Sequence, residues 1–156
     1  MGIENLAELS FNPFHMARII MYFLSAAGGA ASFPRVYLVL PMVLYDPSRS
    51  VLMRANARSS LYSLFLDDQS KREHLAGLQR RYMEYKPLTN ESLVVGASRE
   101  WLKVDSTIAV SQLVRYQDIT EPNLRGLYKA AHYLGVILHK EPHDARVFMS
   151  LGVYPV

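Results

Sequence analysis

Cysteine is absent from this sequence of 156 residues. Without a thiol the chain cannot form a disulfide, a thiolate-ligated zinc site or an iron–sulfur cluster, and it has no cysteine nucleophile. The chain begins MGIENLAELSFNPF, which carries acidic residues instead of the basic region that opens a secretory signal. Both observations favour a cytoplasmic protein, and we expect that localisation.

Long apolar runs are also missing. One uncharged stretch between Arg18 and Arg35 has 16 residues, but Gly28, Gly29 and Pro34 interrupt it. A membrane-spanning helix needs roughly 20 consecutive apolar residues. We therefore expect no membrane segment.

The sequence does contain enough apolar material for one core. Half of the residues are hydrophobic, and 17 lysines and arginines against 14 acids give a formal charge of +3. A chain of this length buries about 70% of its unfolded surface in a single domain. We expect one domain over residues 1–156, with successive regions at 12–45, 49–112 and 120–152.

The first region should open with a helix. Asn12 can accept a hydrogen bond from the free amides of the first turn, and Pro13 supplies a preset backbone angle at the first helical position. Gly28-Gly29 favours the end of this helix. Because the helix is apolar on nearly all sides, it either lies centrally in the domain or gives one face to a partner.

The next segment, FPRVYLVLPMVL at 33–44, is ambiguous. Its β-branched residues favour a strand, but Pro41 would remove a hydrogen bond from a central strand. The sequence therefore leaves helix and strand open here.

The middle region changes from helical periodicity to alternation. Residues 49–66 have a helical pattern, a second helix is expected over residues 67–87, and a short third helix should begin at Thr89. Over residues 101–110 apolar and polar side chains alternate, which predicts a β-hairpin. The order helix, helix, hairpin is typical of a winged helix.

The C-terminal region predicts two more helices. A long one should begin near Glu121-Pro122, and a short one should run from Asp144 to Leu151 and close at Gly152. The expected fold class is thus mainly α with a small β-hairpin, a winged-helix-like α+β single domain.

Sequence motifs give little sign of catalysis. We find no glycine-rich phosphate loop and no nucleophile motif. His139 and His143 are four residues apart, with Glu141 and Asp144 nearby, but Pro142 breaks the continuous helix that would place both imidazoles on one face. We expect no enzymatic activity, no cofactor and no metal. A hydrolase using His139, His143 and Asp144 stays open as an alternative.

Basic residues point instead to nucleic acid. The isoelectric point is about 9.2, and arginines can neutralise phosphates. The candidates for DNA contact are Arg49, Arg54, Arg58, Arg80 and Arg81. The competing interpretation is an ordinary mixed-charge surface, because residues 67–86 carry five basic and four acidic side chains.

Five segments spread over the chain carry a family likeness. They are Asn12-Pro13 before an apolar helix, LVLPMVL at 38–44 followed by Asp46-Pro47-Ser48-Arg49, KPLTNESLVVG at 86–96, the WLKVD hairpin, and SLGVYP at 150–155. Together they resemble the middle component of bacterial three-component ABC systems, the small subunit that accompanies an SMC-like ATPase and an effector in Lamassu-type defence.

The resemblance implies an adaptor. ATP hydrolysis would belong to an SMC-like ABC ATPase dimer and DNA cleavage to an effector subunit, expected to be a nuclease. This chain would bridge the two in anti-phage or anti-plasmid defence and reach DNA through the complex. The expected partner-facing residues lie in the first helix and the LVLPMVL segment: Met21, Leu24, Leu38, Leu40, Pro41 and Leu44. The alternative function is a free-standing winged-helix regulator that binds DNA.

Overall fold

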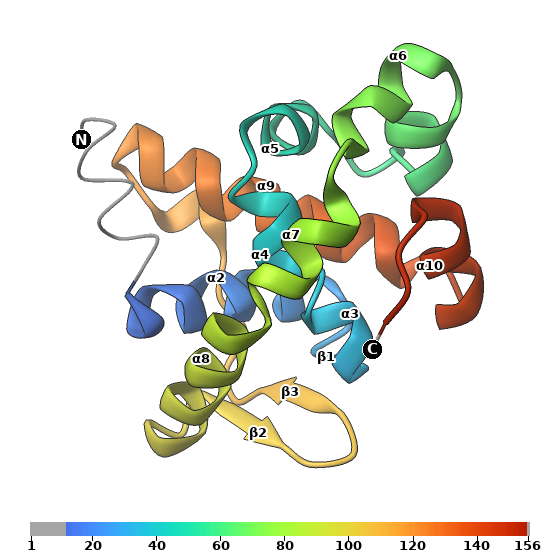
Figure 1. Cartoon of the computed structure of the whole chain (residues 1–156). Coiled ribbons are helices and arrows are strands. Elements are labelled where there is room, and N and C mark those ends of the chain that lie inside the picture. The colour runs from blue at the N-terminus through green and yellow to red at the C-terminus, as the bar shows by residue number, and fades with distance from the viewer. Residues whose placement is uncertain (1–11, 156) are drawn as a thin grey trace.

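Helices make up most of the structure, a computed structural model that describes residues 12–155. The longer helices are α2 (Pro13–Ala26), α5 (Asp46–Met53), α7 (Leu78–Glu84), α8 (Lys86–Ser98), α9 (Pro122–His139) and α10 (Asp144–Leu151). Shorter turns are α3 (Phe33–Val36), α4 (Val39–Val43), the π-helical η1 (Tyr62–Leu66), α6 (Gln69–Arg72), η2 (Glu73–Leu75) and η3 (Tyr116–Asp118). Strands β1 (Ala30–Ala31), β2 (Leu102–Val104) and β3 (Ile108–Val110) complete the fold (Figure 1). The expected class, mainly α with a small hairpin, is confirmed.

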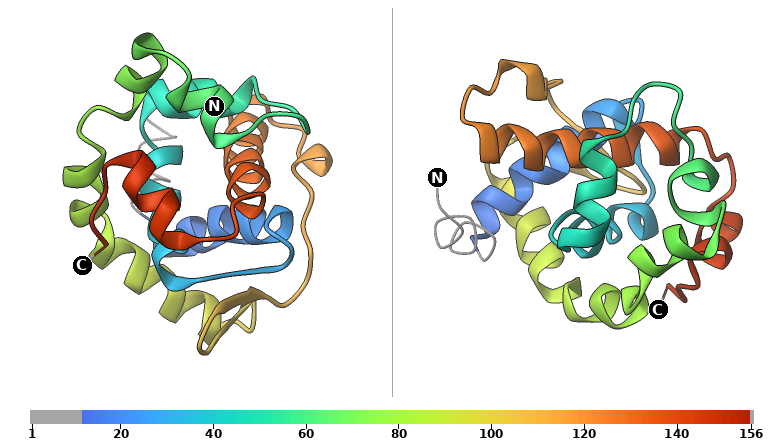
Figure 2. Two further views of the ribbon diagram at one scale, coloured as in Figure 1. Left: turned by 90° about the vertical axis from the view of Figure 1, so that its right-hand side faces the viewer. Right: turned by 90° about the horizontal axis from the view of Figure 1, so that it is seen from above.

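The centre of the fold is the contact between α2 and α9. The Asn12 side chain accepts a hydrogen bond from the Phe14 amide at 2.9 Å, which confirms the expected helix start. Glu121 caps α9 in the same way, accepting from the Leu124 amide at 2.7 Å. Figure 2 shows α9 crossing the molecule against α2. The backbones approach so closely that a Cβ on Gly135 would lie 2.3 Å from the Phe23 carbonyl oxygen.

The ambiguous segment at 33–44 is helical. It forms α3 and α4, in which Val36, Val39 and Leu40 are fully buried. Pro41 is the third residue of α4, where the backbone amide has no acceptor within the helix, so its missing N–H costs no hydrogen bond. Burial on several sides, rather than the alternation of a sheet face, explains the run of β-branched residues.

The middle region is more broken than its periodicity predicts. A continuous helix over 49–66 is wrong, because α5 ends at Met53 and helical structure resumes only at Leu61. The helix expected over 67–87 is interrupted at Gly77, whose φ is +75°. Pro87 does not end a helix but is the second residue of α8, where proline is well tolerated.

The predicted hairpin forms, and a third strand joins it. β2 and β3 pair with Leu102 opposite Val110, while β1 pairs with the other edge of β3, Ala30 opposite Ala109. The strand order is therefore β1-β3-β2. The small sheet therefore has three antiparallel strands with β3 in the middle. The expected winged-helix arrangement is not confirmed.

One cluster of buried hydrophobic side chains extends from Met16 to Val153. Among residues 12–155, none of the helices combines the length and hydropathy that crossing a bilayer requires.

Candidate partner-docking site

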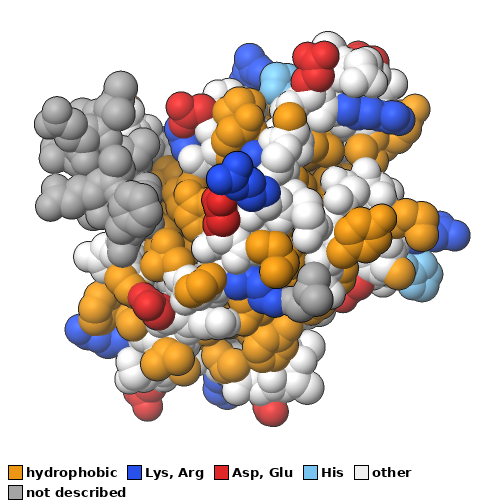
Figure 3. All heavy atoms as spheres, viewed as in Figure 1, with side chains coloured by type: hydrophobic (Ala, Val, Ile, Leu, Met, Phe, Trp, Pro, Cys, Tyr) orange, Lys and Arg blue, Asp and Glu red, His pale blue; other side chains and the backbone are white. Residues whose placement is uncertain are grey.

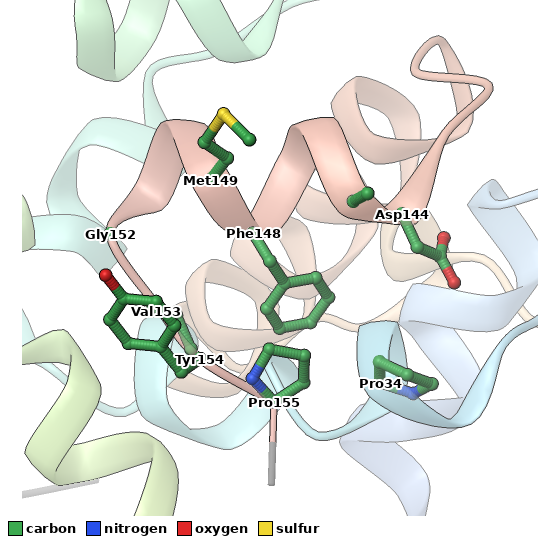
Figure 4. Close-up of a pocket in the computed structure, with 9 residues that line it drawn as sticks. Pro34, Asp144, Phe148, Met149, Gly152, Val153, Tyr154 and Pro155 are labelled. Atoms are coloured by element: carbon green, nitrogen blue, oxygen red, sulfur yellow. The ribbon is translucent and has the colours of Figure 1, made fainter.

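The C-terminal flank is built by α10 and the short tail that follows it. Gly152 ends α10 with φ +71°, and the Val153 amide donates to the Phe148 carbonyl at 3.0 Å. A left-handed residue followed by this backward hydrogen bond is the Schellman motif, which reverses the chain direction. The tail therefore folds back beside α10, as Figure 4 shows.

Between α10, the tail and α3 lies a hollow of about 440 Å³ with mostly apolar walls. We call it the C-terminal groove; it is lined by Pro34, Asp144, Ala145, Phe148, Met149, Gly152, Val153, Tyr154 and Pro155. A groove of this size is comparable to small-ligand and peptide sites.

The groove has a buried floor and an exposed rim. Phe148 and Val153 are each 3% exposed, and the Phe148 ring meets Tyr82 edge-on with centroids 5.8 Å apart. On the rim, Met149 is 81% exposed and Tyr154 is 77% exposed. Figure 3 shows hydrophobic side chains gathered on this part of the surface. Large exposed apolar side chains beside a concave floor are typical of interaction sites.

One side chain holds the tail in place. The Tyr154 amide donates to Oε1 of Gln79 at 2.7 Å, and Nε2 of Gln79 donates to the Tyr154 carbonyl at 3.5 Å. The Gln79 amide group thus bonds the tail as a neighbouring backbone would, which fixes the rim of the groove against α7.

A buried arginine anchors the other wall. Arg35, on α3, donates to the carbonyls of Leu138, in the last turn of α9, and Glu141, just after this helix, and to the Asp144 carboxylate at 2.5 Å. Burial raises the pKa of Asp144, but the Ser32 hydroxyl and the Arg35 charge outweigh burial, so the pKa of this carboxyl lies below its ordinary value. The pair fixes the start of α10 to the core.

Comparison with known proteins supplies the family. The family described as ABC-three component (ABC-3C) system Middle Component 3 matches over residues 2–155. This chain belongs to that family. No curated protein and no solved structure gives a significant match to this middle component.

The partner-facing residues expected from the sequence are mostly inside this middle component. Leu24, Leu38 and Leu40 have no exposed area, and Pro41 is also buried. A side chain without exposed area cannot contact a partner in the same fold, so Leu24, Leu38 and Leu40 act as core residues. Met21 and Leu44 are partly buried and pack against that core.

Two of the arginines proposed for DNA contact face their own chain. The Arg81 guanidinium lies 3.5 Å from the centroid of the Tyr45 ring and donates to the Pro41 carbonyl at 3.2 Å. Arg49 donates to the Val43 carbonyl and pairs with Asp46. Both guanidinium groups therefore hold α4 and the start of α5 in place, which limits what they can offer to a phosphate.

The other three arginines are exposed. Arg80 pairs with Glu84 at 2.8 Å along α7, which leaves that pair neutral. Arg54 and Arg58 form no ion pair within the described part of the chain and lie at and after the end of α5. Arg54 and Arg58 are the candidates that keep an available positive charge.

The histidines are not brought together as metal ligands. α9 ends at His139, and Pro142 lies in the connection before α10, as expected. Within residues 12–155, His, Asp and Glu side chains form no group of three or more that could hold a metal ion.

Sequence reasoning missed the groove itself. The signals available were the SLGVYP segment at 150–155 and the helix-ending Gly152, which together indicate a reversal of the chain. No sequence pattern identified Arg35 or Gln79 as anchors, since their partners lie far away in the chain.

Proposed function

We propose that this middle component is the non-catalytic adaptor of an SMC-like ABC ATPase complex in Lamassu-type defence against phages or plasmids. The observation that carries the proposal is the family match over residues 2–155. A middle component of a three-component system has protein partners by definition. In this proposal an SMC-like ATPase dimer senses DNA, an effector nuclease acts on it, and the adaptor works between them in the cytoplasm.

The surface of the chain supports a role in binding protein. The C-terminal groove exposes Met149 and Tyr154, residue types that contribute strongly to protein interfaces. A bridging subunit also needs a second contact surface. Val94 on α8 and Val104 on β2 are 69% and 42% exposed and supply apolar area on a different part of the molecule (Figure 1).

Bridging would work through a difference in contact energy. If the ATPase changes shape when it binds DNA and ATP, a subunit that binds one shape more tightly shifts the equilibrium between the two. The adaptor would then hold the effector inactive in one state and release it in the other. Such coupling requires no catalytic group in the adaptor.

The decisive experiment is co-purification of the tagged chain expressed with the other subunits of its own system. We expect mass spectrometry to identify a coiled-coil ATPase and an effector, and we expect DNA binding that depends on the ATPase and on ATP. A lone chain with salt-sensitive DNA affinity would contradict the adaptor and favour the winged-helix regulator.

A double variant separates direct from indirect DNA contact. Arg54→Glu with Arg58→Glu reverses two available charges at exposed positions. If the arginines touch phosphates, the salt dependence of DNA binding by the complex falls by about one counterion for each contact. Under the adaptor proposal the complex keeps its wild-type DNA affinity. The control is Arg115→Glu, which reverses the charge of an exposed arginine outside the five candidates.

A further inference from the structure

The C-terminal groove continues beyond its own walls. A hollow of about 580 Å³ beside η1 and α6 shares Met149 and Gly152 with it. A smaller hollow of about 210 Å³ beside α3 and the start of α8 shares Pro34 and Pro155 with it. The three hollows adjoin at these shared residues, and we call the surface that they form the extended groove. Three adjoining hollows favour an elongated occupant over a compact small molecule.

The unpaired charges of the extended groove lie at its two ends. Its charged lining residues are Arg72 at the η1 end, Lys86 at the α8 end and Asp144 between them. Asp144 is neutralised by the buried Arg35 at 2.5 Å. Arg72 and Lys86 have no ion-pair partner among residues 12–155. The surface therefore has an apolar middle and an uncompensated positive charge at each end.

We propose that the extended groove binds an acidic, amphipathic segment of a partner subunit. Apolar side chains of the segment fill the C-terminal groove, and its carboxylates pair with Arg72 and Lys86. This inference rests on the adaptor function and names the chemistry of one of its contacts. Nucleic acid fits less well, because its regularly spaced phosphates need cations along the whole path and the middle of this path is apolar.

The rim residues provide the energy of docking. Met149 and Tyr154 lose most of their contact with water when a segment covers them, and neither contributes to the core while exposed. The buried ring of Phe148 gives the segment a rigid floor. The two end charges add salt dependence, since exposed ion pairs are weak and are screened by salt.

The test uses the whole chain, expressed together with the other subunits of its system. A photo-crosslinking p-benzoylphenylalanine at Met149 should capture a segment of the ATPase or effector that is rich in Asp and Glu around apolar residues. Met149→Asp should weaken co-purification of that partner by at least about tenfold, as the loss of an interface hot spot does. Arg72→Glu and Lys86→Glu should each weaken it by about threefold and reduce its salt dependence.

Two matched controls keep the test specific. Leu113 is 68% exposed in the segment after β3, so Leu113→Asp adds the same charge at another largely exposed apolar site outside the groove. Arg115→Glu reverses an exposed cation that lies outside the groove, directly before η3. Both variants should retain wild-type co-purification. Thermal unfolding of each variant confirms that the fold is intact.

The outcomes separate this inference from the adaptor proposal. If the wild-type chain recovers no partner, the adaptor proposal and the inference both fail. If the complex assembles and Met149→Asp assembles equally well, the groove inference fails and the adaptor survives. Capture of a basic segment, of DNA or of a second copy of this chain would also overturn the inference, because each is a different occupant.

Discussion

The α2–α9 contact and the C-terminal flank use the same kinds of apolar residue in opposite ways. At the helix contact, Ile20, Phe23 and Leu134 have no exposed area. On the flank, Met149 and Tyr154 are 81% and 77% exposed beside a buried floor. The first arrangement contributes directly to folding stability, while the second leaves apolar area in water that only binding can bury. Stability and interaction are thus separated in space, and variants can test that separation.

The largest expected effect is a difference in folding stability between two variants, one with a carboxylate in the core and one with a carboxylate on the rim of the groove. Leu24→Asp buries a carboxylate without a partner and should lower the free energy of unfolding by about 4 kcal/mol or more, enough to cause aggregation. Met149→Asp should leave it within about 0.5 kcal/mol of wild type. Chemical denaturation of both variants measures the difference. A soluble, stable Leu24→Asp chain would break the comparison, because Leu24 would then be a surface residue.

Removing the anchor between the two regions should have the next largest effect. Arg35→Ala removes the buried charge that pairs with Asp144 and one donor from each of the Leu138 and Glu141 carbonyls, which should cost about 3 kcal/mol. Arg146→Ala, at an exposed position on α10, is the control and should be neutral. Hydrogen exchange should show the loss of protection concentrated at α10. Uniform loss across α2 would mean that Arg35 supports the core itself.

Two glycines of α9 differ in what an added Cβ would contact, so their alanine variants should differ in stability. Gly135→Ala places a Cβ 2.3 Å from the Phe23 carbonyl, which forces the helices apart and should cost about 2 kcal/mol. Gly126→Ala meets only the flexible end of Met53 at 2.7 Å, so improved helix propensity should make it neutral or stabilising by up to about 1 kcal/mol. Thermal unfolding of the pair measures both signs. Equal changes in stability for the two variants would show that the contact with the Phe23 backbone does not determine the cost of a Cβ at Gly135.

A smaller effect is expected from backbone strain at the ends of α8 and α10, where one residue in each case has a positive φ. Gly152 ends α10 with φ +71°, and Glu100 follows α8 with φ +61°. A residue with a Cβ is strained in this conformation, so Gly152→Ala should lower stability and Glu100→Gly should raise it, each by about 1 kcal/mol. Opposite shifts in the unfolding midpoint are expected, and shifts of the same sign would contradict the strain argument.

The smallest effect concerns pH. The pKa of Asp144 is lower in the folded state than in the unfolded chain. Its ionised carboxylate therefore stabilises the fold above the ordinary carboxyl pKa of about 4, and this contribution is lost as the pH falls through the folded-state pKa. Asp144→Asn should therefore reduce the loss of stability on acidification. Arg35→Ala should reduce it too, since it removes the positive partner. Denaturation at neutral and acidic pH compares the three chains.

The sequence by itself determined where several elements begin and end. Asn12-Pro13 starts α2, Glu121-Pro122 starts α9, and Gly152 closes α10, all as expected. The alternation over residues 101–110 gave the hairpin. These features follow from local chemistry, because caps, proline geometry and the two-residue period act between near neighbours in the chain.

Periodicity failed where long-range packing decides. The segment 33–44 has the composition of a strand but forms two short helices within the core. The helices expected over 49–66 and 67–87 are each broken. Strand β1 has only two residues and exists because β3 offers it a free edge. A partner far away in the sequence fixes the burial of 33–44 and the pairing of β1, whereas the break at Gly77 is a local one, at a residue with φ +75°.

Only the tertiary structure decided which apolar side chains are available to a partner. Leu24 and Leu40 were expected at an interface and lie in the core, whereas Met149 and Tyr154 lie in water. The reason is physical: the hydrophobic effect depends on total buried area and has no direction, so residue type sets how favourable burial is but not where it occurs. The anchors Arg35 and Gln79 likewise gain their roles only when the fold brings α9, α10 and the tail to them.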